Sequence, residues 1–400
     1  MERAKRIEIA KKVLALVDKG EPEYGEESWE TDIGRFIDKD RFELEKKLLF
    51  QEHPQLIALS ADIEKPGDYY ATDIAGKPIL LTRDKQGKAH AFLNACRHRG
   101  VQLAEGCGNA QRMTCPYHAW TYAMDGKLVS LPNREAFEPD QLRGLIELPS
   151  IEKGGMILVH PQPDGKLDWD EFFGPMAAYL EDFHIEDYTL IHTYREKARI
   201  NWKHAVDGGL EAYHAPILHK DTFGTGGLSQ LLHIPFGEHH ALIAPSEEIL
   251  KLKDMPEEEW PHHCHFNSTN AIFPNTVIGG GRPGLPVLFF QRSEPADEPG
   301  ECNYVFRLYG LKNPDEEEKK AQQFGIDLFM KVAVGEDMPT QVSLQKMMEA
   351  GAVPTIIFGK REINLTRMHK AYDRMINHNA EAAVARVKDR MRGLAKEAAE

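Results

Sequence analysis

The segment Cys96-Arg97-His98 is followed, after sixteen intervening residues, by Cys115-Pro116-Tyr117-His118. Each half places one cysteine and one histidine close together, in a region of short β-like runs and turn-forming residues. A cluster of two irons and two sulfides needs four protein ligands, and two imidazoles in place of two thiolates on one iron raise its reduction potential. The two segments therefore predict a [2Fe-2S] cluster that is held by two loops.

A tetrahedral zinc site is the alternative for the same two cysteines and two histidines. Zinc sites more often pair cysteine with cysteine and histidine with histidine, whereas a Cys-x-His segment followed by a Cys-x2-His segment is the Rieske pattern. Gly100, Gly106 and Gly108 between the halves suit loops that curl over a cluster, and Arg97 and Arg99 are placed to support it. The pattern favours the iron–sulfur cluster over zinc.

The other cysteines of the chain belong to neither half of this motif. They are Cys107, Cys264 and Cys302. An odd total of five cysteines, in a chain that starts without a recognisable signal segment, does not indicate a disulfide framework. We expect Cys107 to be a free thiol and the other two to lie in core or strand positions.

A second motif begins at Asn201-Trp202-Lys203 and ends in Glu211-Ala212-Tyr213-His214-Ala215-Pro216-Ile217-Leu218-His219. Non-haem Fe(II) oxygenases bind iron through two histidines and one carboxylate on one face, which leaves the opposite positions open. Glu211 and His214 are three residues apart, so a helix would place them side by side. His214 and His219 are five apart, and a regular helix would separate them by about 140°. They converge only if the helix breaks or widens, and Pro216 gives a reason for this.

The third ligand of such an iron has to come from elsewhere in the chain. The segment Gly335-Glu336-Asp337-Met338-Pro339 precedes a predicted helix, where Asp337 is either an ordinary N-cap or the carboxylate ligand. Glu336 is the neighbouring competitor. We favour Asp337 as the ligand, a preference that rests largely on the family resemblance described below.

The remaining sequence indicates an α+β fold. Helices are predicted at 1–20, 40–51, 171–222, 315–334, 338–350 and 364–400. Strands are predicted within 66–160 and 230–310, with hairpin connections at Ala75-Gly76 and Asp84–Lys88 and a turn at Asp164-Gly165. The segment Asn313-Pro314-Asp315-Glu316 predicts a helix start, with Asn313 as the N-cap and Pro314 in the first position. A small antiparallel β domain would thus follow an N-terminal helical segment.

Composition limits the classes of function. The chain has 400 residues, of which 42% are hydrophobic and 28% charged, as in globular proteins of two or three domains. The formal net charge of −14 argues against a nucleic-acid partner, which needs a basic surface. The apolar runs are too short to span a bilayer, and the N-terminus begins an amphipathic pattern, not a signal segment. We therefore expect a cytoplasmic protein with no membrane partner.

Both motifs together, in this order, resemble the large (alpha) subunit of Rieske non-haem iron aromatic-ring-hydroxylating oxygenases, over roughly residues 45–350. The resemblance implies a small all-β Rieske [2Fe-2S] domain inserted in a helix-grip (START-like) catalytic domain with an antiparallel sheet. It divides the chain into an N-terminal helical segment at 1–45 that packs on the catalytic domain, a Rieske domain at 46–160 and a mononuclear iron domain at 161–400.

The resemblance also assigns metal ligands. Two cysteines would hold one iron of the cluster and two histidines the other, namely Cys96 and Cys115, and His98 and His118. The single Fe(II) would be held by His214, His219 and Asp337. Asp207 would lie in the surroundings of that iron.

The family implies a trimeric ring in which the cluster of one chain lies beside the mononuclear iron of the next. Glu211 would then be the bridge for electrons, between His118 of a neighbouring chain and His214. Aromatic-ring dioxygenases usually have Asp at this position. Glu there is similar to oxygenases of quaternary ammonium compounds such as choline or carnitine, although those tend to have a shorter His-x3-His gap and this chain has His-x4-His.

The implied activity is that of the terminal oxygenase component, acting on a small organic substrate, with aromatic compounds favoured. Monohydroxylation, dihydroxylation and oxidative demethylation all stay open. The pocket should be mostly apolar. Candidate wall residues are Leu210, Leu218, Phe266, Asn267, Phe273, Phe289 and Phe290.

No segment of the sequence indicates an FAD domain, an NAD domain or a plant-type ferredoxin. Electrons from NAD(P)H would therefore arrive indirectly, from a separate reductase, with or without a ferredoxin. We expect a homotrimer, with or without a small beta subunit. The rival hypothesis is a Rieske electron carrier joined to a helix-grip ligand-binding domain without an active mononuclear iron, and the complete set of two histidines and a carboxylate argues against it.

Two further patterns have ordinary explanations. Gly279-Gly280-Gly281-Arg282-Pro283-Gly284 matches the dinucleotide-binding pattern, but this pattern requires a helix directly after it, and a strand-like run follows here. His262-His263-Cys264-His265 is able to bind metal, but neighbours on a strand point to opposite faces, so we expect a strand with one or two pocket-facing residues. The charged run 367–400 predicts a solvated packing helix.

Overall fold

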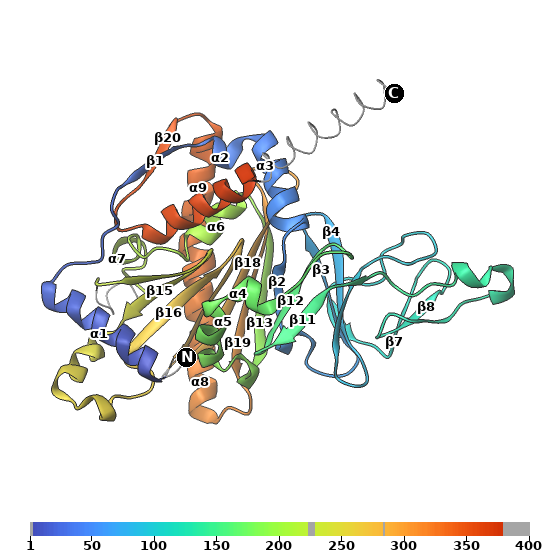
Figure 1. Cartoon of the computed structure of the whole chain (residues 1–400), viewed down its shortest axis with the longest axis horizontal. Helices are drawn as coiled ribbons and strands as arrows, with labels where there is room; N and C mark the ends of the chain where they lie inside the picture. The colour runs from blue at the N-terminus through green and yellow to red at the C-terminus, as the bar shows by residue number, and fades with distance from the viewer. Residues whose placement is uncertain (1–2, 223–228, 283–284, 379–400) are drawn as a thin grey trace, which may run out of the picture.

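A computed structural model describes residues 3–222, 229–282 and 285–378 of the chain. Its main element is a seven-stranded antiparallel sheet in the order β13-β19-β18-β17-β16-β15-β14. The strands are β13 (Tyr188–Ala198), β14 (Leu232–Phe236), β15 (His239–Pro245), β16 (Phe266–Ile272), β17 (Thr276–Arg282), β18 (Leu285–Pro295) and β19 (Cys302–Leu311). Figure 1 shows this sheet in the body of the molecule, while a smaller β region extends away at one end.

Both faces of the sheet are buried. One face packs on a helical layer, which consists of α6 (Trp202–Asp207), α8 (Glu316–Met330), a π-helical segment (Lys331–Asp337) and α9 (Met338–Glu349). The other face packs on α1 (Arg3–Lys19), α4 (Trp169–Phe173) and α5 (Pro175–Leu180). Because successive side chains of a strand point to opposite faces, Phe289 belongs to the first layer and Phe290 to the second.

The smaller β region contains a five-stranded sheet in the order β10-β5-β4-β3-β6 and two three-stranded sheets, β11-β12-β2 and β7-β8-β9. The strands are β2 (Gln55–Leu59), β3 (Asp68–Ile74), β4 (Lys77–Arg83), β5 (Ala89–Leu93), β6 (Cys107–Asn109), β7 (Arg112–Thr114), β8 (Thr121–Ala123), β9 (Leu128–Ser130), β10 (Glu147–Leu148), β11 (Ser150–Lys153) and β12 (Met156–Val159). The predicted hairpin at Ala75-Gly76 joins β3 to β4, and both residues have positive φ, 47° and 87°, as a tight hairpin turn requires. The predicted fold class, α+β with a small all-β domain beside an antiparallel catalytic sheet, is confirmed. The domain boundaries at 45/46 and 160/161 stay predictions.

Most of the predicted helices are present. Residues 40–51 form α3 (Lys39–Glu45) and a π-helical turn (Lys46–Gln51), and 364–378 lie within a helix over 363–378. The rest of the predicted C-terminal helix, 379–400, lies outside the described residues. The predicted turn at Asp164-Gly165 is present as a bend closed by a hydrogen bond from Gly165 N to the carbonyl of Gln162, at 3.0 Å.

The helix predicted over 171–222 is wrong for 188–198, which form β13. The run from Tyr188 to Tyr194 is rich in aromatic and β-branched residues, which favour strands. β19 pairs with β13 along its length, from Tyr188 opposite Leu311 to Ala198 opposite Cys302. This partner, far away in sequence, decides the structure of the segment.

The predicted start of the helix after 313 is two residues too early. Asp315, not Asn313, is the N-cap: its side chain accepts hydrogen bonds from the backbone of Glu317 and Glu318. Glu318 accepts one in return from the backbone of Asp315, at 2.9 Å, which completes a capping box. Asn313 has a left-handed φ of 53° and lies before the helix.

An unpredicted pair of strands ties the N-terminal segment to the C-terminal part. β1 (Trp29–Asp32) pairs antiparallel with β20 (Thr355–Phe358). α2 (Gly34–Ile37) and α3 follow β1 directly and lie against the helical layer of the catalytic sheet.

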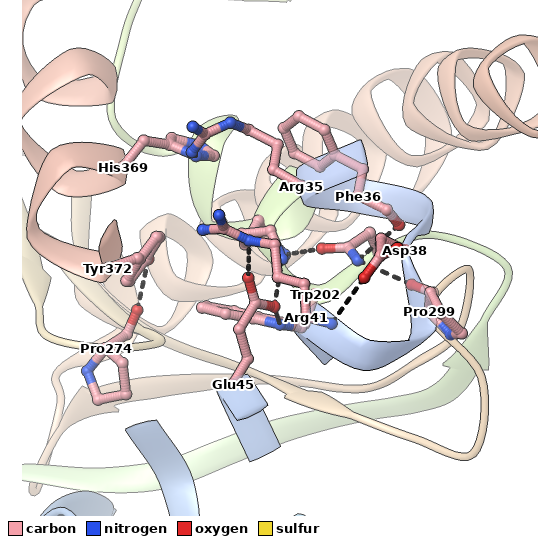
Figure 2. Close-up of polar contacts among 12 residues, drawn as sticks. Arg35, Phe36, Asp38, Arg41, Glu45, Trp202, Pro274, Pro299, His369 and Tyr372 are labelled. Carbon is pink, nitrogen blue, oxygen red and sulfur yellow. Dashed lines mark hydrogen bonds and ion pairs between the residues drawn. The ribbon is translucent and has the colours of Figure 1, made fainter. Parts of the chain in front are cut away.

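A buried polar anchor holds α6, the helix that leads into the second motif (Figure 2). Asn201 is the N-cap of α6, and its amide also donates to the carbonyls of Phe36 and Pro299, at 2.9 and 2.8 Å. Trp202 donates through its indole N–H to Glu45, at 3.1 Å, and the ammonium of Lys203 pairs with the same carboxylate. The side chains of Glu45 and Lys203 are fully buried, and burial lowers the pKa of Lys203 to about 8 although Glu45 opposes this. The Asn201-Trp202-Lys203 segment therefore has a structural role in fixing α6 to the N-terminal segment.

We predict that Lys203→Met destabilises the protein strongly. The substitution removes the buried ammonium partner of Glu45 and leaves the partly exposed Arg41 as its remaining cationic partner. The loss should therefore lie toward the lower end of the about 3–5 kcal/mol that breaking a buried pair costs in the free energy of unfolding. Denaturant unfolding measures the loss. Lys5→Met, which removes an exposed ammonium that pairs with Glu8, is the matched control and should leave the midpoint unchanged. Equal midpoints for the two variants would contradict the anchoring role.

Candidate metal centres

Two loops of matching geometry carry the cysteines and histidines of the first motif. In the first loop, Cys96 N donates to the carbonyl of Val101 at 2.8 Å and Gly100 N donates to that of Cys96 at 2.9 Å. In the second, Cys115 N donates to Trp120 at 2.8 Å and Ala119 N donates to Cys115 at 3.0 Å. The residue four after each cysteine has a positive φ, 77° at Gly100 and 56° at Ala119. Each loop thus makes a tight turn whose histidine follows the cysteine by two or three residues.

The thiols of the two loops lie deep and the imidazoles lie toward the surface. Cys96 and Cys115 are each only 3% exposed, whereas His98 and His118 are partly exposed. The two imidazole rings meet edge-on, with centroids 4.7 Å apart and an interplanar angle of 67°. The hydroxyl of Tyr122 lies 3.3 Å from Cys96 Sγ. The loops therefore bring together one pair of sulfur ligands and one pair of nitrogen ligands, as a Rieske cluster requires.

The protonation chemistry of these side chains fits a bound metal cluster. The Nδ1 atom of His98 is buried and has no hydrogen-bond partner among the described residues. Burial, with smaller contributions from His118 and Arg99, lowers the pKa of His98, which keeps the ring in the neutral, metal-binding form. Burial also raises the pKa of Cys96, so a thiolate there needs a cation beside it. The four residues would hold the cluster, and they stay predictions as ligands.

The side chains of the second predicted centre converge on one point. Nε2 of His214 and Nε2 of His219 are 3.2 Å apart, and Oδ1 of Asp337 lies 3.6 Å from the first and 3.2 Å from the second. Among the described residues, these three form a compact group of metal-binding side chains whose ligand atoms all lie within 4.8 Å of one another. Two imidazoles and a carboxylate in this arrangement match the facial triad of non-haem Fe(II) sites.

A carboxylate stands behind each imidazole of this triad. Nδ1 of His214 forms a short hydrogen bond with Glu211, and Nδ1 of His219 lies 2.8 Å from Glu336. Glu336 also accepts a hydrogen bond from the hydroxyl of Thr222, at 3.0 Å. A carboxylate on Nδ1 fixes the tautomer in which Nε2 carries the lone pair, so both rings present a ligand atom to the metal. Glu336 therefore bonds Nδ1 of His219, on the side of the ring away from Asp337, and does not take the place of Asp337 beside Nε2.

The carboxylates also set the charge of the site. Burial lowers the pKa of His219, but Asp337 and Glu336 outweigh this effect and raise its pKa above the ordinary value. Protons therefore compete with the metal for His219 as the pH falls.

The backbone departs from a regular α-helix at the two histidines and again at Asp337. His214 precedes the short helix α7 (Ala215–Leu218) and His219 follows it, so the two rings lie at opposite ends of one turn. Pro216 lies in the first turn of α7, where proline is tolerated, so it starts the helix and does not break it as expected. Glu211 and His214 are in contact as predicted, although 211–214 are not helical.

Asp337 ends the π-helical segment between α8 and α9. Its φ and ψ of −68° and −53° are helical, and its side chain makes no cap hydrogen bond. The alternative of an ordinary N-cap is therefore wrong. Single π-turns inside helices frequently mark functional sites, and this one places Glu336 and Asp337 on two sides of His219.

Asp207 lies at the end of α6, in a polar network with His369 and Arg35. Its carboxylate is 2.9 Å from Nε2 of the buried His369, whose Nδ1 is 3.2 Å from the guanidinium of Arg35. Because a guanidinium only donates, His369 Nδ1 accepts and Nε2–H donates to Asp207. The described contacts of Asp207 thus hold α6 in place and do not include either histidine of the triad.

A cavity of about 340 Å³ opens beside the triad. Of the seven predicted wall residues, Asn267 and Phe289 line it. The prediction is wrong for Leu210, Phe266, Phe273 and Phe290, which are buried in the hydrophobic clusters, and Leu218 is also absent from the wall. Phe266 and Phe290 each neighbour a wall residue on a strand, so their side chains point to the other face.

Several residues of the cavity wall were not predicted from the sequence. Tyr304 and Phe306 come from β19, and Leu328, Phe329, Val332 and Ala333 come from α8 and the π-helical segment. The alternating pattern of β19 and the helical spacing of 328, 329, 332 and 333 carry a signal for one shared face, but the sequence does not say which face meets the metal.

The glycine-rich run 279–284 and the histidine-rich run 262–265 lie outside both motifs. β17 is followed by β18 and not by a helix, which excludes a dinucleotide-binding turn at Gly279–Arg282, while Pro283 and Gly284 lie outside the described residues. The strand expected at 262–265 is wrong, because Cys264 and His265 have positive φ, 46° and 52°, in a turn before β16. Cys107 has an exposed thiol outside any disulfide, and Cys264 and Cys302 are buried, as expected.

Comparison with known proteins identifies both parts of the chain. Residues 53–151 match the Rieske [2Fe-2S] domain family, and residues 183–378 match the catalytic domain of ring-hydroxylating alpha subunits. The chain belongs to the Rieske ring-hydroxylating oxygenase family. Its cofactors are a [2Fe-2S] cluster and a mononuclear iron, and the residues described above fit both.

Individual members of this Rieske family show moderate similarity. The chain is 30% identical over 237 residues to the carnitine monooxygenase oxygenase subunit of Escherichia coli K12, which covers 57% of this chain and 63% of that protein. It is 28% identical over 350 residues to the large oxygenase component of salicylate 5-hydroxylase from a Ralstonia species, covering 76% of this chain and 81% of that protein. The chain thus spans less than two thirds of the carnitine subunit's own length in that match.

Solved structures of the family share the fold. A quaternary ammonium Rieske monooxygenase superposes with a TM-score of 0.74 at 20% identity, covering 86% of this chain and 94% of that one. Naphthalene 1,2-dioxygenase from a Rhodococcus species superposes with a TM-score of 0.72 at 19% identity, covering 92% and 98%. In the described part of this Rieske chain, every helix is too short or too polar to span a lipid bilayer.

We predict that Glu336→Gln weakens metal binding at the triad without removing a ligand. Loss of a carboxylate behind a metal-bound histidine costs about 10–100-fold in affinity. Anaerobic titration with Co(II) as a spectroscopic probe measures the dissociation constant. The control Glu317→Gln changes an exposed carboxylate on α8 and should leave the constant unchanged. Equal affinities for the two variants would contradict the proposed support of His219.

Proposed function

We propose that the chain is the terminal oxygenase component of a Rieske non-haem iron oxygenase system, which uses O₂ and electrons from a separate reductase to hydroxylate or oxidatively demethylate a small organic substrate. The observation that carries the proposal is the convergence of His214, His219 and Asp337 at the wall of a cavity. An electron carrier with a mere ligand-binding domain needs none of these three side chains.

The residues around the centre have distinct tasks. An iron(II) held by the triad supplies the activation of O₂, and the [2Fe-2S] cluster supplies single electrons. Glu211 and Glu336 accept the Nδ1–H groups of His214 and His219 and so keep both Nε2 atoms directed at the metal. The cavity beside them would hold the substrate against a mostly apolar lining.

We infer that electrons cross between chains. Figure 1 displays α7, which separates the two iron histidines, near one end of the long axis, and β7 and β8, which flank the second cluster loop, at the other end. Two centres at opposite ends of one chain are too far apart for direct transfer, so a ring assembly, in our proposal a homotrimer, would bring His118 of one chain to Glu211 of the next. The exposure of Tyr213 (61%) and Ile217 (79%) beside Glu211 is consistent with a surface that another chain covers.

The remaining parts of the proposal concern partners and location. A reductase, directly or through a ferredoxin, would supply electrons from NAD(P)H, and a beta subunit is optional. Five cysteines with no disulfide among them suit the reducing cytoplasm. Similar proteins include oxygenases of carnitine, glycine betaine, salicylate and 2-halobenzoate, which leaves aromatic catabolism and quaternary ammonium breakdown as routes, with monooxygenase or dioxygenase chemistry.

His214→Ala tests the enzyme proposal. We predict that this variant keeps the visible absorption of the [2Fe-2S] cluster and loses substrate-dependent O₂ uptake, measured with an oxygen electrode and a chemically reduced ferredoxin as donor. The control His262→Ala removes a histidine that is 59% exposed and should keep the uptake. Uptake that survives His214→Ala would contradict the role of the triad and favour the electron carrier.

A further inference from the structure

One wall of the cavity beside the iron triad is aromatic. Tyr304 and Phe306 on β19 lie nearly parallel, with an interplanar angle of 8° and centroids 6.2 Å apart. Phe289 on β18 lies at 22° to Phe306, with centroids 5.7 Å apart. These three rings stack along one side of the cavity, whereas a cage for a quaternary ammonium ion surrounds the cation with rings from several sides.

Glycines on the next strand keep the floor of the cavity open. A Cβ atom on Gly279 would lie 2.7 Å from the ring of Phe289, so only glycine leaves that ring its place. Gly280 itself lines the cavity. The aromatic wall on β18 and β19 is therefore separated from β16 by a strand without side chains at these positions.

Beyond the glycines, the cavity has polar groups that are free to bind. The side chains of Asn267 and Thr269 on β16 and of Gln341 on α9 line it and have no hydrogen-bond partner among the described residues. Gln291 differs, because its amide donates to the carbonyl of Ala205 and accepts from Tyr304 at 3.1 Å. These three side chains are partly exposed, so a polar occupant of the cavity can take the place of water as their hydrogen-bond partner.

The described lining contains no lysine and no arginine. Its charged side chains are Glu211 and Asp337, and Glu336 stands behind His219. Iron(II) at the triad would be balanced by Asp337 and Glu211, and Glu336 adds one further negative charge, while both glutamates already bond the histidines. No positive charge is therefore left to pair with an anion. Burial raises the pKa of Tyr304 well above its ordinary value, so this phenol stays uncharged as well. A carboxylate anion placed here would lack a counter-ion, and burial of an unpaired charge is strongly unfavourable.

We propose that this cavity selects uncharged substrates: a flat apolar body lies against Phe289, Tyr304 and Phe306, and a neutral hydrogen-bonding group faces Asn267 and Thr269. The inference rests on the proposed function in that it takes this cavity as the substrate site. The volume of about 340 Å³ is at the lower end of ligand cavities, which suits a body of one or two rings.

Binding of isosteric probes tests the inference without turnover. Anaerobic calorimetry of the iron-loaded protein at pH 7.5 compares benzamide with benzoate and 2-naphthamide with 2-naphthoate, and phenyltrimethylammonium serves as a cationic probe. We expect each amide to bind at least about tenfold more tightly than its acid and than the cation. An acid or the cation that binds as tightly as the amides, or the failure of both amides to bind, would overturn the proposal.

A charge placed in the cavity provides the second arm. Asn267→Arg supplies the missing counter-ion. The ratio of benzoate affinity to benzamide affinity should therefore rise at least about tenfold over the ratio in the unaltered protein. Thr193→Arg adds the same charge at an exposed position of β13 and should leave the ratio unchanged. Thermal unfolding and cluster absorbance verify that Asn267→Arg folds, and the probe comparison on the unaltered protein decides the matter if it does not.

Oxygen uptake separates the two hypotheses. A protein that prefers amides but never consumes O₂ with any probe would refute the proposed oxygenase function and keep the selectivity. If the protein consumes O₂ with the acids and binds them more tightly than the amides, the oxygenase function stands and the proposed preference for uncharged substrates is refuted.

Discussion

The geometry of the proposed iron triad, His214, His219 and Asp337, depends on two carboxylates that lie behind the histidine rings. A histidine ring binds metal only through a nitrogen that carries a lone pair, and the partner of the other nitrogen decides which one that is. Glu211 and Glu336 occupy Nδ1 of His214 and His219, so both Nε2 atoms meet within 3.2 Å. Without these contacts, the rings would be free to rotate and the triad would lose its shape.

The surrounding fold keeps those carboxylates in register. α6 enters the motif from a buried anchor in which Asn201 caps the helix and Lys203 pairs with Glu45 (Figure 2). The second carboxylate comes from the π-helical turn between α8 and α9, 117 residues after His219. The long helix pair covers one face of the seven-stranded sheet, so the same packing that buries the sheet also closes the metal site and its cavity.

The sequence was informative where the chemistry is local. Cys96 and His98, or Cys115 and His118, are neighbours on one turn, so their spacing alone predicts a pair of ligands. Other features depend on partners far away in sequence. The segment 188–198 becomes a strand because β19 pairs with it. The sequence did not distinguish Phe289 from Phe290 as a wall residue, since neighbours on a strand face opposite sides and the sheet is buried on both. The position of Glu336 follows from one π-helical turn, which a regular helical pattern does not predict.

The central claim is that this single chain holds two different iron centres, which metal analysis tests most directly. Iron, zinc and acid-labile sulfide should be measured per chain in protein purified without air. The account predicts about three irons and about two sulfides per chain, with little zinc. Zinc bound at about one per chain, with no sulfide, would contradict it, because the loops at Cys96 and Cys115 would then form the tetrahedral zinc site and no electrons could reach the triad.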